Sequence, residues 1–218
     1  MTGIVDYNAG NIRSVERAVT ALGIDFITSK NPKDLEKAER VIFPGVGDAQ
    51  YAMAQLKKTG FDSFLKDYAA SKRPLLGICL GSQIIFDWSE EGDTPCLGLI
   101  KGSVRHFSNV YKEQGVTGAY KIPQIGWNSI EFAKKADGNP VCPLVKDVPE
   151  HSDFYFVHSY IICPESWDVV AGWTDYGVKV PAIIQNGSVM AFQFHPEKSA
   201  VHGLTMLKNF STLGGTSC

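Results

Sequence analysis

The first half of the chain alternates short apolar runs with segments of helical periodicity, and this alternation constrains the fold more than any other feature. The runs have the length of buried strands and are followed closely by asparagine, proline or glycine. They cover Gly3–Tyr7, Ile24–Thr28, Arg40–Phe43 and Pro74–Leu76. Between the first two, apolar residues recur at helical spacing at Ile12, Val15, Ala18, Val19 and Leu22. Strands separated by helices in this way form parallel sheets, so we predict an α/β fold with a mostly parallel sheet.

From about Cys96 onward, closely spaced strands replace this alternation. The expected strands are Gly102–Phe107, Asn128–Phe132, Asp153–His158, Asp168–Trp173, Ala182–Gln185 and Val189–Phe194. They predict an antiparallel layer or an antiparallel extension of the sheet. We expect the first of them to lie at a sheet edge and to be followed by a polar loop to Lys121. A helix is expected from about Ala200 to Leu213, with a loose tail after it. No repeat or linker marks a boundary, so we expect a single domain over residues 1–218.

Composition narrows the function classes. The 218 residues are 44% apolar and 20% charged with a net charge of -2, as in an ordinary globular protein. No basic block favours nucleic acid, and no apolar run approaches the ~20 residues that span a bilayer. The N-terminus lacks the pattern of a signal peptide. We therefore expect a cytoplasmic protein that binds neither nucleic acid nor membrane.

The cysteines are odd in number and scattered. They are Cys79, Cys96, Cys142, Cys163 and Cys218, and no two form a C-x-x-C pair. This spacing favours neither a disulfide framework nor a zinc site, so we expect no metal and no cofactor. A reducing compartment would also keep a catalytic thiol free.

The segment Gly77–Gln83 has the pattern of a reactive turn. It reads Gly-x-Cys-x-Gly at the end of an apolar strand, directly before a helix-like segment, which is the context of a nucleophile elbow with cysteine as the nucleophile. Glycines on both sides permit the close backbone approach that a strained turn requires. A helix N-terminus behind Cys79 would favour its thiolate. The competing interpretation is a buried core cysteine.

A cysteine nucleophile needs a base, and that base needs an orienting group. His195 closes the run Val189–Phe194 and is followed by Pro196 and Glu197. On an extended backbone, residues i and i+2 project to the same side, so we expect Glu197 to lie beside His195. His158 is the rival base, although its ring could equally be a satisfied core group.

An acyl-transfer site also needs donors for the developing oxyanion. One is expected from the N–H of Leu80, which follows the nucleophile. The second should come from the segment Pro44–Gly47, whose glycines allow a peptide to turn its N–H inward. In isolation this segment could also be an ordinary strand-to-helix turn or a phosphate cradle.

Taken together, Pro44–Gly47, Gly77–Gln83 and His195–Glu197 resemble, in order and spacing, the motifs of class I glutamine amidotransferases, and the resemblance covers essentially the whole chain. Further segments resemble the glutaminase subunits (HisH) of imidazole glycerol phosphate synthase. These segments are Asp6–Asn11, Pro123–Asn128, Tyr155–Tyr160 and Lys198–Ser199. One departure is Asn8-Ala9-Gly10, where the family more often has Gly-x-Gly. The resemblance implies a flavodoxin-like sheet, mostly parallel with an antiparallel extension and with helices on both faces.

The resemblance also implies roles for individual residues. Cys79 would attack the side-chain amide of L-glutamine, with His195 as base and then acid, oriented by Glu197. The N–H groups of Leu80 and, after a peptide rearrangement, Val46 would hold the oxyanion. The substrate would be bound by Gly47, Gln83, Glu91, Ser159 and Tyr160. From the residues alone, Gln83 could equally be an exposed helix residue and Glu91 part of the acidic turn Glu90–Asp93.

A glutaminase domain of this kind uses nearly all 218 residues, so we expect the ammonia acceptor to lie on another chain. The resemblance implies that this partner is the cyclase subunit HisF, a (β/α)8 barrel. In such a heterodimer, ammonia passes through a channel and the cyclase makes imidazole glycerol phosphate and AICAR in histidine biosynthesis. The interface candidates are Asn11, Trp127, Tyr155 and Lys198, although Trp127 could equally be core.

Three alternatives remain. A HisH-like glutaminase could supply a different synthase, for example in amidino-sugar biosynthesis, and the sequence hardly separates this from the first hypothesis. A non-catalytic amidotransferase-like binding module is disfavoured because Cys79, His195 and Glu197 are all present. A cysteine peptidase is disfavoured by the late His-Pro-Glu and by Gln83.

Overall fold

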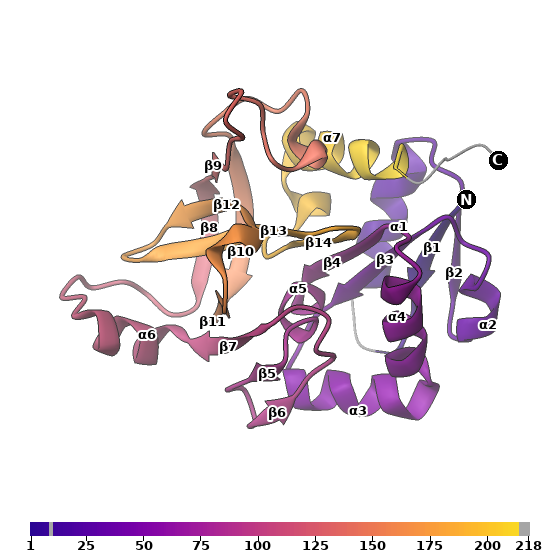
Figure 1. The fold of residues 1–218 in the computed structure, drawn as a ribbon, viewed down its shortest axis with the longest axis horizontal. Helices are drawn as coiled ribbons and strands as arrows, with labels where there is room; N and C mark the ends of the chain where they lie inside the picture. Colours follow the sequence, from indigo (N-terminus) through magenta and orange to yellow (C-terminus); the bar gives the residue numbers. More distant parts are fainter. Residues whose placement is uncertain (9–10, 214–218) are drawn as a thin grey trace.

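In the computed structural model, which describes residues 1–8 and 11–213, the central sheet has eight strands (Figure 1). Five neighbouring strands run parallel, in the order β2-β1-β3-β4-β14. Their bounds are Phe26–Ser29, Thr2–Val5, Arg40–Gly45, Leu75–Cys79 and Val189–Phe192, respectively. This is the flavodoxin-like order, in which ligands bind at the carboxyl ends of the strands. The prediction of a mostly parallel α/β sheet is confirmed.

The sheet continues beyond β14 with antiparallel strands. The added strands, in order, are β13 (Lys179–Asn186), β12 (Val170–Asp175) and β9 (Glu131–Phe132). The predicted antiparallel extension is therefore confirmed. Figure 1 shows β8, β9, β10 and β12 gathered to one side of the parallel strands.

Helices cover both faces of the parallel strands, because successive strand residues point to opposite sides. Ile4 of β1 belongs to a core cluster with α1 and α7, whereas the next residue, Val5, belongs to a second cluster with α3 and α4. These four helices are α1 (Ile12–Ala21), α7 (Ala200–Ser211), α3 (Ala49–Thr59) and α4 (Phe61–Ala70). A short helix, α2 (Pro32–Leu35), is capped by Asn31, whose side chain accepts a hydrogen bond from the Lys33 N–H.

Two smaller sheets complete the fold beside the extension. One has the order β11-β7-β5-β6, and the other is the antiparallel ribbon of β8 and β10. Their strands are β11 (Tyr160–Pro164), β7 (Gly102–His106), β5 (Trp88–Ser89), β6 (Thr94–Pro95), β8 (Gln124–Ser129) and β10 (Asp153–His158). Short 3-10 turns occur at Pro143–Val145, Trp167–Val169 and Pro196–Lys198.

Two predictions for the middle of the chain are wrong. The strand at Gly102 is not at an edge, since β7 pairs with β11 on one side and with β5 on the other. The expected polar loop after it begins with a helix, α6 (Phe107–Gln114). This helix is stable because its apolar residues pack against Val178 and Val180, and because Gly115 ends it in the left-handed conformation with φ +66°.

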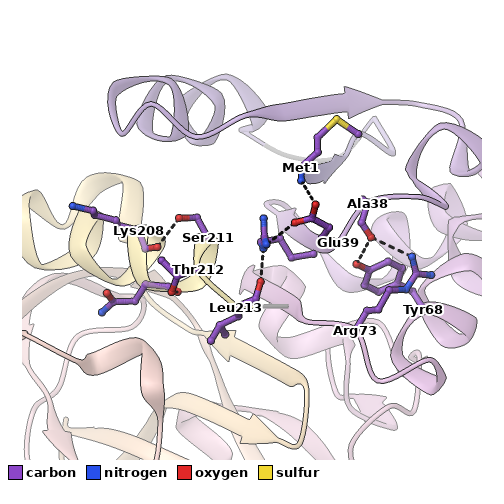
Figure 2. Close-up of polar contacts among 11 residues, drawn as sticks. Met1, Ala38, Glu39, Tyr68, Arg73, Lys208, Ser211, Thr212 and Leu213 are labelled. Carbon is purple, nitrogen blue, oxygen red and sulfur yellow. Dashed lines mark hydrogen bonds and ion pairs between the residues drawn. The ribbon is translucent and has the colours of Figure 1, made fainter. Parts of the chain in front are cut away.

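Polar contacts connect Met1 to the segment after α7 at the N-terminal ends of the strands (Figure 2). The Met1 amine lies 3.0 Å from a Glu39 carboxylate oxygen. Arg40 contacts the same carboxylate at 2.7 Å and donates from Nε to the Leu213 carbonyl at 2.6 Å. These contacts join the starts of β1 and β3 to the segment after α7. They lie at the end of the sheet opposite the carboxyl ends of the strands.

No helix in the described part of the chain is long and apolar enough to cross a membrane. The predicted helix near the C-terminus is confirmed as α7, and the tail after Leu213 lies outside the described residues. The departure at Asn8-Ala9-Gly10 is only partly described. Asn8 has φ +64°, a left-handed conformation that asparagine tolerates better than most residues, and Ala9 and Gly10 lie outside the described residues.

Candidate active site

Cys79 lies in a strained turn at the carboxyl end of β4. Its φ of +55° and ψ of -112° are unusual for a residue with a side chain, and α5 (Leu80–Ile84) starts directly after it. Neighbouring glycines make this turn possible. A Cβ on Gly77 would lie 2.8 Å from the Gly81 carbonyl oxygen, and one on Gly81 would overlap the Phe43 carbonyl oxygen. Only glycine fits at these two positions, as the elbow pattern requires.

The segment Pro44–Gly47 leaves β3 beside this turn, because Gly45 pairs with Cys79 in the β3–β4 register. A Cβ on Gly45 would lie 2.7 Å from the Tyr7 hydroxyl and 2.8 Å from the Gly81 nitrogen. Gly47 has φ +93° and nothing lies within 4 Å of the place where its Cβ would be. The segment is therefore tightly packed at Gly45 and open at Gly47.

His195 follows β14 and contacts Glu197 through its Nδ1, 2.8 Å from the carboxylate Oε1. The side chains of His195 and Glu197 are only 3% and 2% exposed. The expected extended geometry is wrong, because Pro196–Lys198 forms a 3-10 turn. The turn still brings the carboxylate to the ring, and Ser199 fixes it by donating from Oγ to the His195 carbonyl at 2.6 Å.

The electrostatics of His195 favour its protonated form. Burial by itself lowers the pKa of the ring, but hydrogen bonds with Cys79 and Glu197, together with their negative charges, outweigh burial and raise the pKa to about 9. Cys79 and His195 line the same cavity, so the ring and the thiol face one site. His195 can therefore hold a proton beside Cys79 and return it to a leaving group.

His158, the rival base, is placed differently. Its Nδ1 lies 2.7 Å from the Tyr160 carbonyl oxygen, so Nδ1 carries the hydrogen and donates. Burial lowers the pKa of His158 to about 4, with the Tyr160 carbonyl opposing and His195 adding to this effect. A ring with so low a pKa and no carboxylate partner is a weaker base than His195.

The residues predicted for catalysis, the oxyanion and the substrate, apart from Glu197, line one cavity of about 300 Å³. They are Val46, Gly47, Cys79, Leu80, Gln83, Glu91, Ser159, Tyr160 and His195. Pro123, Val157 and His158 complete the lining. The cavity lies at the carboxyl ends of β3 and β4, and its volume is at the small end for ligand sites, which suits a ligand the size of an amino acid.

Gln83 and Glu91 are both part of this cavity wall, rather than of exposed surface. Gln83 is only 5% exposed, and its side-chain nitrogen donates to Gln193 Oε1 at 2.9 Å and to the Tyr160 carbonyl at 3.2 Å. The Glu91 carboxylate accepts a hydrogen bond from the Ala49 N–H at 2.8 Å. Burial raises the pKa of Glu91, an effect that the Ala49 N–H opposes.

Three of the interface candidates lie together on the surface. Trp127 is 53% exposed, which contradicts the alternative that it is core, and its ring centroid lies 6.0 Å from that of Tyr155. The Lys198 ammonium lies 5.9 Å from the centroid of the Tyr155 ring, so the three side chains form one cluster. Asn11 is exposed at the residue before α1.

The sequence reasoning missed Gln193. This residue is 1% exposed, and its only advance signal was a polar side chain within the apolar run Val189–Phe194. Its partner Gln83 is 110 positions away, so no local pattern could have paired them.

No group of three or more histidine, cysteine or acidic side chains among residues 1–8 and 11–213 is arranged to hold a metal ion. The described cysteines outside the elbow form no disulfide; they are Cys96, Cys142 and Cys163. Cys218 lies outside the described residues.

The family model for class I glutamine amidotransferases matches residues 3–212, so the chain belongs to that family. Its relatives include subunits named imidazole glycerol phosphate synthase subunit HisH. The protein of that name from Halalkalibacterium halodurans is 42% identical over 214 residues, which cover 98% of this chain and 96% of the relative. The one from Geobacillus kaustophilus is 43% identical over 96% of this chain and 95% of its own length.

Solved structures agree on the fold. A crystal structure described as a glutamine amidotransferase superposes with a TM-score of 0.72 at 18% identity and covers 98% of both chains. A structure of PurLQS from Thermotoga maritima superposes with a TM-score of 0.69 at 19% identity, over 96% of both chains. Identities this low establish the architecture alone.

Proposed function

We propose that this chain is a glutaminase that hydrolyses L-glutamine to glutamate and ammonia. The observation that carries the proposal is the buried pair of His195 and Glu197 beside Cys79, at the wall of a cavity of suitable size. A nucleophile, a base and an orienting carboxylate in this arrangement are what covalent acyl transfer requires.

The chemistry proceeds in two stages. His195 takes the thiol proton of Cys79, the sulfur attacks the side-chain carbonyl carbon of glutamine, and a C–S bond forms. As the C–N bond breaks, His195 gives its proton to the leaving nitrogen, so ammonia departs and a γ-glutamyl thioester remains. Water then attacks the thioester while His195 takes a proton from it, and glutamate leaves with Cys79 restored. Glu197 stabilises the imidazolium throughout.

The oxyanion of each tetrahedral intermediate would be held by backbone N–H groups. Leu80 is the first residue of α5, and the N–H groups of a first helical turn have no partner within the helix. The second donor would be the Val46 N–H, from the segment that lines the same cavity. Gln83, Glu91, Gly47, Ser159 and Tyr160 would bind the amino acid end of the substrate.

The ammonia would pass to a partner chain. The relatives are named as subunits of imidazole glycerol phosphate synthase, which supports a cyclase subunit, HisF, as that partner in histidine biosynthesis. We propose that the cluster of Trp127, Tyr155 and Lys198 forms the surface that contacts the partner. Asn11 is a fourth candidate for this surface. Tyr155 also connects this surface to the triad, because its carbonyl accepts a hydrogen bond from the His195 N–H at 3.0 Å.

The test is glutamine hydrolysis by the chain alone and in complex with a HisF cyclase carrying its ligand. We expect a low rate alone, a sharp rise in the complex, and no hydrolysis by Cys79→Ala, which should still bind the cyclase. The matched control is Cys96→Ser, which keeps the hydrogen bond to the Thr94 carbonyl and should hydrolyse glutamine normally. Near-normal turnover by Cys79→Ala would contradict the mechanism, and equal rates alone and in complex would contradict the coupling.

A further inference from the structure

Two buried amides meet behind the cavity wall. The Gln83 side-chain nitrogen donates to Gln193 Oε1 at 2.9 Å and to the Tyr160 carbonyl at 3.2 Å. Gln83 lines the cavity, whereas Gln193 does not. Gln193 is 1% exposed, and its backbone N–H donates to the Ala182 carbonyl at 2.9 Å, which anchors it in the sheet. Gln193 therefore contacts the cavity wall through Gln83.

The Tyr160 carbonyl fixes which way the Gln83 amide points. A carbonyl only accepts hydrogen bonds, so the NH2 end of the amide faces it. With one N–H directed at Tyr160 and the other at Gln193, both donors of the amide are used. The oxygen of Gln83 accepts no hydrogen bond from the described residues and is the polar atom left for the cavity.

Tyr160 alone would hold this orientation weakly. The last torsion of a glutamine side chain is broad, so an amide can turn over at little cost unless its partners prevent it. The Tyr160 carbonyl is also shared, because it accepts from His158 Nδ1 at 2.7 Å. Gln193 supplies the shorter of the two contacts to Gln83, and its carbonyl oxygen would face the oxygen of Gln83 if that amide turned over.

We propose that Gln193 is a positioning residue that holds the Gln83 amide with its oxygen toward the cavity, where it accepts a hydrogen bond from the α-ammonium of glutamine. The Glu91 carboxylate lines the same cavity, so a negative charge and a fixed acceptor together favour a cationic group at this end of the ligand. This inference rests on the proposed glutaminase function and adds a determinant of substrate selectivity to it.

The test compares two substrates in the complex with the cyclase. L-Glutamine carries the α-ammonium, and glutaramate has the same carboxamide and carboxylate but lacks it. Gln193→Met keeps the length of the side chain and removes the acceptor. Since a hydrogen bond to a charged group is worth about 10-fold to 100-fold in affinity, we expect KM for L-glutamine to rise by about that factor. We expect kcat for L-glutamine, and kcat/KM for glutaramate, to change by less than about threefold, because neither depends on that bond.

Two further variants separate positioning from a merely structural effect. In a Gln83→Met background, Gln193→Met should cause no additional rise in KM, because the residue through which it acts is gone. Gln193→Glu retains an acceptor for the Gln83 N–H and should restore KM for L-glutamine to near the wild-type value. The matched control is Gln185→Met on β13, which does not line the cavity and should leave both substrates unaffected.

Loss of activity to the same extent on both substrates, or multiplicative effects of the Gln83 and Gln193 substitutions, would overturn the inference. If Gln193→Met does not give a cooperative thermal transition, Gln193→Glu and Gln83→Met decide the matter. The proposal then requires that only Gln83→Met loses discrimination between the substrates. A wild-type complex that hydrolyses neither substrate would refute the proposed function itself, and an active wild type with an unchanged Gln193→Met would refute only the inference.

Discussion

Replacing Glu197 by glutamine tests the electrostatics of the triad most directly. The carboxylate contacts His195 Nδ1 at 2.8 Å, and both side chains are almost fully buried. Burial lowers the pKa of His195, and Cys79 and Glu197 together raise it from its ordinary value of 6.5 to about 9. A rise of this size corresponds to about 3 kcal/mol of preferential stabilisation of the imidazolium. Glu197→Gln removes the part of this energy that depends on the carboxylate charge.

The sign of the pH dependence follows from the raised pKa. The folded protein binds the His195 proton more tightly than the unfolded chain, so the resulting stability is fully present below about pH 6.5 and is lost as pH rises through about 9. Glu197→Gln lowers the pKa of His195 toward its ordinary value and should flatten this dependence. We expect the stability advantage of the wild type over the variant to shrink by about 1–3 kcal/mol between about pH 6 and pH 10.

Urea unfolding of the wild type and the variant across this pH range measures the difference. The control is Glu113→Gln, whose exposed carboxylate pairs with Arg105 and should not change the pH dependence in this range. Glutamine hydrolysis by Glu197→Gln should fall by about 10-fold or more, because about 1.4 kcal/mol of lost imidazolium stabilisation is a factor of ten in rate. Parallel stability curves for the wild type and Glu197→Gln would refute the reasoning.

Three other substitutions test the fold and the surface. Gly81→Ala should destabilise the protein by about 3 kcal/mol or more, or prevent folding, because its Cβ would overlap the Phe43 carbonyl oxygen; a thermal melt of soluble protein near the wild-type midpoint would contradict this. Trp127→Ala should change the free energy of unfolding by less than about 0.5 kcal/mol, because the side chain is largely exposed. It should weaken cyclase binding by about 2 kcal/mol in titration calorimetry. Unchanged affinity would place the interface elsewhere. Tyr68→Phe should lower the free energy of unfolding in urea by about 1 kcal/mol, because it removes the 2.9 Å hydrogen bond to the Ala38 carbonyl. An unchanged free energy would show that the hydrogen bond from Arg73 is enough for that carbonyl.

The sequence was most informative where a residue's constraint is local. The glycines around Cys79 could be interpreted from their spacing, because a strained turn excludes a Cβ whatever the rest of the fold does. The parallel sheet followed from strands alternating with helices. The helix α6 was missed because Phe107–Gln114 is mostly polar. Its few apolar residues are buried against residues far along the chain, Ile161, Val178 and Val180.

Parts of the site depended on contacts that no local pattern encodes. The 3-10 turn at Pro196–Lys198 replaced the expected extended geometry, although the contact between His195 and Glu197 still forms. Gln193 could not be assigned a partner, because Gln83 reaches it only after β4 and β14 pair. The environment of His158 likewise depended on a distant residue, because its ring centroid lies 5.2 Å from that of Phe107.

The glycines beside the elbow also set a limit on how the segment after β3 can rearrange. At Gly45 an added Cβ would lie too close to the Tyr7 hydroxyl and the Gly81 nitrogen. At Gly81 an added Cβ would overlap the Phe43 carbonyl oxygen. Gly47, two residues on, has open space around it and a positive φ. In the proposed mechanism, a peptide that turned its N–H toward the cavity would rotate beyond Gly45, where Gly47 has a positive φ. The ends of β3 and β4, and with them Cys79, would then keep their positions while the second oxyanion donor moved.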